Sequence, residues 1–90
     1  MGRKGGNETM KQKIGFYAEE ISEKGNYHDK IGPFDNIDDA EMEAFRMWQF
    51  LSEREQGFHK IYVSKCLITY DDNDELYDED CISSSLEYGE

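Results

Sequence analysis

The chain's first regular pattern is an alternation of apolar and polar residues. Between Ile14 and Ala18, larger apolar side chains fall on every second position, as in a strand with one buried face. Residues 24–26, Lys-Gly-Asn, supply turn chemistry, because Gly and Asn tolerate a positive φ. A second strand is expected over 27–31 and ends before Pro33, which has no N–H to donate to a ladder. We therefore predict a β-hairpin over residues 13–34.

After Asn36, apolar residues recur at every third or fourth position. This Asn is a good N-cap, and Asp39 three residues later approximates a capping box. The apolar residues that this spacing places on one helix face are Ile37, Ala40, Ala44, Met47, Trp48 and Leu51. Gly57 is a natural stop. The pattern predicts a helix over residues 37–55.

The rest of the chain divides into a strand, a turn and polar ends. Residues 58–70 are rich in β-branched and aromatic side chains on both parities, which predicts a central strand covered on both faces. Residues 71–74, Asp-Asp-Asn-Asp, are of types that favour turns. Residues 75–77 predict a short edge strand. Residues 81–90 are acidic, Ser-rich and aperiodic, so we expect a loose tail, and the Gly-rich residues 1–12 predict a flexible leader.

These elements predict one α+β domain over residues 13–80, in the order β-β-α-β with a possible fourth strand. The expected architecture has two layers, an antiparallel sheet of three to four strands with one helix packed on one face. A chain of 90 residues has room for one domain. Its five Phe, six Tyr and one Trp are enough aromatic residues to build a core in an otherwise charged chain.

The charge of the chain is negative and polarised. The net charge is −11, and residues 71–90 contain nine acidic side chains and no basic one, whereas residues 1–13 carry a net positive charge. Such a chain repels nucleic acid and anionic membranes and attracts basic proteins. We therefore expect no direct binding to nucleic acid and none to a membrane, and no stretch approaches the roughly 20 apolar residues of a membrane span.

A cytoplasmic location is expected from two features. The N-terminus has no apolar run of the kind that a signal peptide contains. Two cysteines, Cys66 and Cys81, without an export signal are more typical of free thiols in a reducing compartment than of a disulfide.

Metal chemistry has little support in the spacing of the ligands. Counted from Asp71 as position 1, a calcium loop would need Gly at position 6 and Glu at position 12, where the chain has Leu76 and Ile82. The zinc-type ligands form no CxxC or HxxxH pair; they are His28, His59, Cys66 and Cys81. We expect no metal and no other cofactor, and a solvated acidic turn is the preferred interpretation, with loose divalent-cation binding as the alternative.

Catalysis has no motif either. The run Ser83–Ser85 lies in the predicted tail, where no base would be held beside a hydroxyl. Cys66 in the middle of a strand is more typical of a small buried residue than of an activated thiolate. The glycines form no phosphate-binding fingerprint. We expect a protein that is not an enzyme.

The remaining signal is the clustering of carboxylates. Fixed carboxylates can imitate the phosphates of a nucleic acid and so bind the Lys- and Arg-lined groove of a nucleic-acid-binding protein. The candidate partner-binding residues are Asp35, Asp38, Asp39, Glu41 and Glu43 near the helix start, and Asp71, Asp72, Asp74, Glu75, Asp78, Glu79 and Asp80 near the C-terminus. The competing interpretation is that these charges only keep the protein soluble.

In size, charge and layout the chain resembles small acidic phage-type proteins that inhibit host defence, namely DNA-mimic anti-restriction proteins and some anti-CRISPR proteins. The shared traits are about ninety residues, a charge of −11, a hairpin followed by a helix, and no enzyme motif. Residues 31–40, Ile-Gly-Pro-Phe-Asp-Asn-Ile-Asp-Asp-Ala, look like a strand-to-helix junction common in small phage and bacterial domains. The resemblance implies a stoichiometric inhibitor with a basic protein partner and assigns no individual residue a role.

Two other function classes stay open. A structural module that self-associates, for example as a homodimer, is indicated by Phe45 and Phe50, which exceed what one helix face needs for a core. A metal-dependent enzyme or cation sensor is the third class and depends on the acidic turn.

Overall fold

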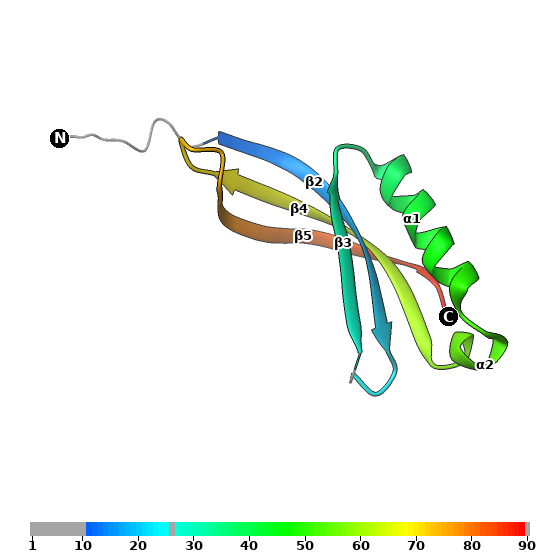
Figure 1. Cartoon of the computed structure of the whole chain (residues 1–90). Coiled ribbons are helices and arrows are strands. Elements are labelled where there is room, and N and C mark those ends of the chain that lie inside the picture. The colour runs from blue at the N-terminus through cyan, green and yellow to red at the C-terminus, as the bar shows by residue number, and fades with distance from the viewer. Residues whose placement is uncertain (1–10, 26, 90) are drawn as a thin grey trace.

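The computed structural model describes residues 11–25 and 27–89. Its elements, in chain order, are β2 (Lys11–Ser22), β3 (His28–Phe34), α1 (Ile37–Phe50), α2 (Glu53–Gln56), β4 (His59–Tyr70) and β5 (Leu76–Tyr88) (Figure 1). The strands form one antiparallel sheet in the order β3-β2-β4-β5. The predicted α+β class with an antiparallel sheet of up to four strands is confirmed. Of the predicted leader 1–12, only Lys11 and Gln12 are among the described residues, and they begin β2.

β2 and β4 are the two central strands of the sheet. β2 and β4 pair along twelve residues, from Lys11 opposite Tyr70 to Ser22 opposite His59. β4 also pairs with β5 on its other side, so the predicted central strand at 58–70 is confirmed. Its β-branched and aromatic residues suit a strand with neighbours on both sides.

The hairpin of β2 and β3 forms as predicted, with one difference at its end. Gly25 turns the chain with a φ of 74°, and β3 then continues through Pro33 to Phe34 instead of ending before the proline. Pro33 is tolerated because β3 is an edge strand, where a missing N–H need not break a ladder. Gly32 has a φ of 147°, and a Cβ there would lie 2.8 Å from the carbonyl oxygen of Phe16, so only glycine fits this approach.

Helix α1 begins where the sequence predicts and ends earlier. The Asn36 side chain accepts a hydrogen bond from the backbone N–H of Asp39 at 2.9 Å, which fixes the first turn. The predicted continuous helix over 37–55 is wrong beyond Phe50. The chain leaves the helix at Leu51, and Ser52 starts α2 with a capping box in which Glu55 returns the hydrogen bond.

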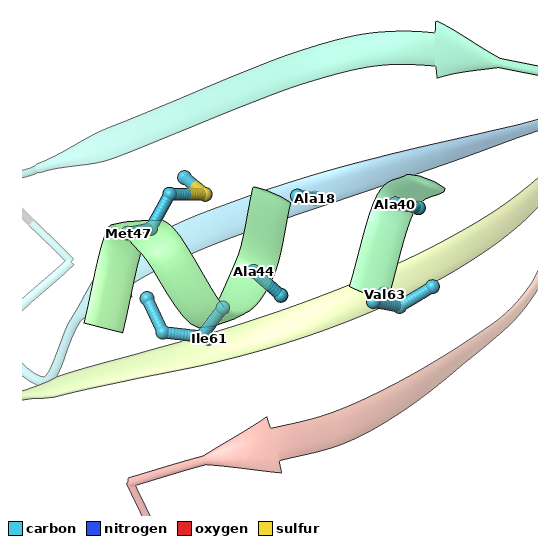
Figure 2. Packing of buried hydrophobic residues seen from close by; sticks show 6 residues of the cluster. All are labelled: Ala18, Ala40, Ala44, Met47, Ile61 and Val63. Carbon is cyan, nitrogen blue, oxygen red and sulfur yellow. The ribbon is translucent and has the colours of Figure 1, made fainter. Parts of the chain in front are cut away.

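The main core lies between α1 and the central strands. Ala40, Ala44 and Met47 on α1 are buried against β2 and β4 (Figure 2). The sheet contributes three buried apolar residues, Ala18, Ile61 and Val63. Because Ala18, Ala40 and Ala44 are small, the helix can lie close to the sheet. The apolar spacing that predicted the helix is therefore the spacing of its buried face.

A second apolar cluster is formed by the alternate residues of the central strands, those that do not face α1. It consists of Tyr17, Cys66 and Ile68, with Tyr70 packed against them. These residues alternate with the residues that face α1, so they point to the opposite face of the sheet. Side chains of the two edge strands meet over this cluster, because Lys30 Nζ of β3 lies 2.6 Å from Glu79 Oε1 of β5. An ion pair between side chains therefore links the two edge strands across this face of the sheet.

Strand β5 is the largest departure from the sequence prediction. We expected a short strand at 75–77 and a loose tail over 81–90, yet β5 runs from Leu76 to Tyr88 and pairs with β4 along most of its length. Its end docks on the helix, since the Tyr88 and Trp48 rings stack with centroids 5.5 Å apart. Pairing with a central strand orders this segment, although its own sequence is polar. The prediction of a tail is wrong for residues 81–88.

Candidate acidic binding surface

The helix-start carboxylates lie around the first turns of α1. We use this name for Asp35, Asp38, Asp39, Glu41 and Glu43. All are exposed except Glu43, which is half-buried and accepts a hydrogen bond from Arg46 at 3.2 Å. The Asp39 carboxylate accepts a hydrogen bond from the Asn36 side-chain amide, so the cap that starts the helix also holds this carboxylate. The structure therefore presents four of the five to solvent on an ordered helix end.

The C-terminal carboxylates occupy the β4–β5 turn and the first part of β5. They are Asp71, Asp72, Asp74, Glu75, Asp78, Glu79 and Asp80. All are exposed except Asp71 and Glu79, which are half-buried. Figure 1 shows this turn at the end of the sheet away from α1. The two sets of carboxylates are thus attached to different elements.

Two ion pairs connect the sets through the start of β2. Lys13 Nζ lies 3.2 Å from Asp35 Oδ1, and Lys11 Nζ lies 3.1 Å from Asp74 Oδ1. Lys11 and Lys13 are two residues apart on one strand, which separates their Cα atoms by about 7 Å. The sets therefore approach each other at the beginning of β2, where two lysines partly neutralise them.

The acidic turn is held in one conformation by Asp71. Its Oδ1 accepts hydrogen bonds from the backbone N–H groups of Asn73 at 2.8 Å and Glu75 at 3.0 Å. Asp74 takes a φ of 62°, a conformation that Asp tolerates better than most residues. Since its donors are backbone groups of the turn, the Asp71 carboxylate acts as a structural residue. It positions Asp72, Asp74 and Glu75 before any partner binds.

Glu79 belongs to the second apolar cluster more than to the exposed surface. Its carboxylate accepts hydrogen bonds from Lys30 and from the Tyr17 hydroxyl, and the Lys30 ammonium lies 4.3 Å from the centre of the Tyr17 ring. These hydrogen bonds, that of Lys30 first, lower the pKa of Glu79. Burial and the carboxylate raise the pKa of Tyr17. Glu79 therefore links β5 to side chains of β2 and β3 and is not a free charge.

Six of the predicted carboxylates have no side-chain hydrogen bond or ion pair within residues 11–25 and 27–89. These are Asp38, Glu41, Asp72, Glu75, Asp78 and Asp80. All six are exposed and lie on α1, on the turn held by Asp71, or on β5. Their charges are directed to solvent, where a cationic partner could meet them.

An acidic pocket beside the C-terminal half of α1 was missed at the sequence level. It is open, about 550 Å³ in volume, and four carboxylates line it, from Glu20, Asp29, Glu43 and Glu55. His59 also lines it, with its Nδ1 2.5 Å from the buried carboxylate of Glu20. The one signal in the sequence is Glu20, a charged residue two positions after Ala18, on the face of β2 that packs against α1. The alternation predicts that this face is buried, but it does not show that Glu20 and Ser22 line a pocket.

The zinc-type ligands considered in the sequence do not form one site among residues 11–25 and 27–89. His28 pairs with Glu19 and His59 with Glu20, so the two histidines lie in separate contacts. In the part of the chain that the structure describes, no three His, Cys, Asp or Glu side chains gather as metal ligands would. No helix there is long and apolar enough to span a bilayer.

Comparison of the chain with protein-family models, with curated proteins and with solved structures finds no match.

Proposed function

We propose that this protein binds a basic surface of a nucleic-acid-binding protein and inhibits it by occupying the place of the nucleic acid. The partner is reached in the cytoplasm, and the chain itself performs no catalysis. The observation that supports this most is a set of six exposed carboxylates on ordered elements that have no ion-pair partner among residues 11–25 and 27–89. The proposal thus extends the resemblance to phage-type DNA-mimic inhibitors from charge alone to charge held in place.

The conformational order of the carboxylates distinguishes nucleic-acid mimicry from a general role of the charges in solubility. A charge on a loose tail must lose conformational freedom when it binds, whereas a charge on a strand has already lost it. Asp78 and Asp80 lie on β5, and Asp72 and Glu75 lie in the turn held by Asp71. We also infer a two-layer arrangement in which α1 covers one face of the sheet, which its packing on β2 and β4 supports. That layer keeps the helix-start carboxylates on a rigid support.

Electrostatics sets the expected mode of binding. A net charge of −11 steers a basic partner during encounter and repels nucleic acids. Since both molecules expose their charges, salt must weaken the complex strongly. The partner's nucleic acid must compete for the same surface.

The test is a capture experiment followed by a displacement experiment. The full chain is immobilised, incubated with a nuclease-treated bacterial lysate, and eluted by rising salt. The captured protein is then purified, bound to a fluorescent DNA or RNA duplex, and titrated with the free chain. The proposal predicts recovery of a nucleic-acid-binding protein that elutes with salt and releases its duplex stoichiometrically. Recovery of a partner that keeps its duplex would overturn it.

Two matched variants distinguish the effect of where the carboxylates lie from the effect of the net charge. One variant combines Asp72→Asn, Glu75→Gln and Asp78→Asn; the control combines Glu23→Gln, Glu53→Gln and Glu87→Gln, which are exposed and outside both sets. Both remove three negative charges. The first must lose displacement and the second must retain most of it. Equal effects would mean that only net charge matters, which contradicts a positioned array.

Self-association is a second candidate, supported by apolar exposure on α1. Phe50 is 81% exposed and Met42 is 67% exposed, and Phe45 is also exposed. Exposed apolar side chains of this size favour contact with another protein surface. Sedimentation of the full chain with Phe50→Ser and Phe45→Ser as comparison decides it. A dimer that these substitutions dissociate supports this candidate, and a monomer at high concentration removes it.

A further inference from the structure

The two cysteines lie directly opposite each other on neighbouring strands. Cys66 of β4 and Cys81 of β5 are paired in the register, beside an irregularity between Lys65 and Cys66. Their Sγ atoms are 2.8 Å apart, although both are free thiols. Paired positions of an antiparallel sheet bring Cβ atoms within about 5 Å, close to the separation that a disulfide requires. Only a small shift separates this contact from a covalent bond.

The two thiols differ in their access to solvent. Cys66 is fully buried in the cluster with Tyr17 and Ile68, whereas Cys81 is exposed on the outer strand. Burial, followed by the hydrogen bond with Cys81, raises the pKa of Cys66. A dissolved oxidant therefore meets Cys81 first, and Cys66 is positioned behind it.

We propose that Cys66 and Cys81 are an oxidisable dithiol that a peroxide converts to an intrachain disulfide. Hydrogen peroxide oxidises the Cys81 thiol to a sulfenic acid and is itself reduced to water. The Cys66 sulfur attacks the Cys81 sulfur and displaces hydroxide, which takes the Cys66 proton and leaves as water. In total, two thiols and one peroxide give one disulfide and two waters.

The consequence is a covalent link between the central strand and the edge strand. β5 carries Asp78 and Asp80 and also Glu79, which joins β5 to Lys30. A disulfide between Cys66 and Cys81 would prevent β5 from separating from β4 at this point. It would restrict the unfolded chain as well, so the oxidised protein must resist denaturant better than the reduced one.

Intact mass and thiol titration test the chemistry on the folded full chain. After treatment with hydrogen peroxide, the wild type must lose both thiols and two hydrogen atoms of mass per chain, form no disulfide-linked dimer, and recover with dithiothreitol. The urea midpoint must rise on oxidation and fall back on reduction. Retention of both thiols, stable addition of oxygen to Cys81, or crosslinked dimers as the only product would overturn the proposal.

Single-cysteine variants test the order of events. With Cys66→Ala, Cys81 must be trapped by dimedone as a sulfenic acid; with Cys81→Ala, Cys66 must stay unreactive while the protein is folded. Equal reactivity of the two thiols would contradict the assigned roles. If Cys66→Ala fails to fold, cysteine-specific labelling of the wild type at short times gives the same comparison. These readouts do not depend on any protein partner.

Discussion

The face of the sheet away from α1 buries apolar side chains next to a contact between Lys30, Glu79 and Tyr17. Ile68 and Cys66 are fully buried on that face. The ion pair of Lys30 with Glu79 joins the two edge strands over them, and Tyr17 donates its hydroxyl to the same carboxylate. The three polar groups thus satisfy one another where water is partly excluded.

Replacing Glu79 tests this contact through its pH dependence. The pKa of Glu79 is lowered below its ordinary value of 4.5, so its contribution to stability is present above that pH and is lost as the pH falls. Glu79→Gln should lower the free energy of unfolding at pH 7 by about 1–3 kcal/mol. The difference from wild type should shrink as urea titrations are repeated below pH 4.5.

Asp78→Asn is the control for Glu79→Gln, because Asp78 is the neighbouring carboxylate, exposed and without an ion pair among the described residues. It should leave the free energy of unfolding nearly unchanged. A Glu79→Gln loss of the same size at every pH would show that shape, not charge, is responsible.

Gly15 lies against the second cluster with little room for a side chain. A Cβ at this position would lie 2.5 Å from Ile68 Cδ1 and 2.9 Å from Pro33 Cβ. Gly15→Ala should therefore destabilise the protein by about 1–3 kcal/mol through overpacking, measured by thermal or urea unfolding. The double variant with Ile68→Val removes the closer atom, so its cost should be smaller than the sum of the two single costs. Strict additivity would place the strain elsewhere.

At the level of elements, the sequence predicts those parts of the fold whose signals are local. The helix start at Asn36, the hairpin turn at Gly25 and the central strand at 58–70 each depend on nearby residues, and the structure has all three. The end of α1 was misjudged because Ser52 and Glu55, a capping box, lie inside an apparently continuous helical pattern.

Strand β5 could not be predicted from its own residues. Its first half is acidic and its second half is Ser-rich, and its order comes from β4 beside it and from the stacking of Tyr88 on Trp48. The predicted carboxylates were found from composition alone, but their division into structural and free charges depends on contacts between distant strands. Glu79 and Lys30 are 49 residues apart in the chain, and nothing local marks them as partners.

Tyr88 is the side chain that tests whether β5 is docked. Tyr88→Ala removes its stacking on Trp48 and its contact with Phe45, whose ring centroid is 6.2 Å away. We expect a loss of about 1–2 kcal/mol in the free energy of unfolding. Tyr77→Ala, at a residue 65% exposed, is the matched control and should cost much less. Equal and negligible effects would mean that residues 81–88 contribute nothing to stability.

For the whole molecule, folding concentrates a polarised charge. Of the nine acidic residues in segment 71–90, the eight that the structure describes lie in a turn and on an edge strand, and β2 of the same sheet begins with basic residues. Charges on an edge strand also oppose strand pairing with another copy, so self-association would have to use α1 instead of β5. The molecule therefore combines exposed carboxylates on β5 and the turn before it with exposed apolar side chains on α1.

The salt dependence of binding tests the positioned acidic array most directly. Affinity for the captured nucleic-acid-binding protein is measured by titration at several salt concentrations for three chains: the wild type, the variant Asp72→Asn, Glu75→Gln and Asp78→Asn, and the control variant Glu23→Gln, Glu53→Gln and Glu87→Gln. We predict that the first variant binds at least about 10-fold more weakly at low salt, about 1.4 kcal/mol, with a shallower salt dependence. The control should follow the wild type. Three superimposable curves, or curves that salt does not change, would contradict the account.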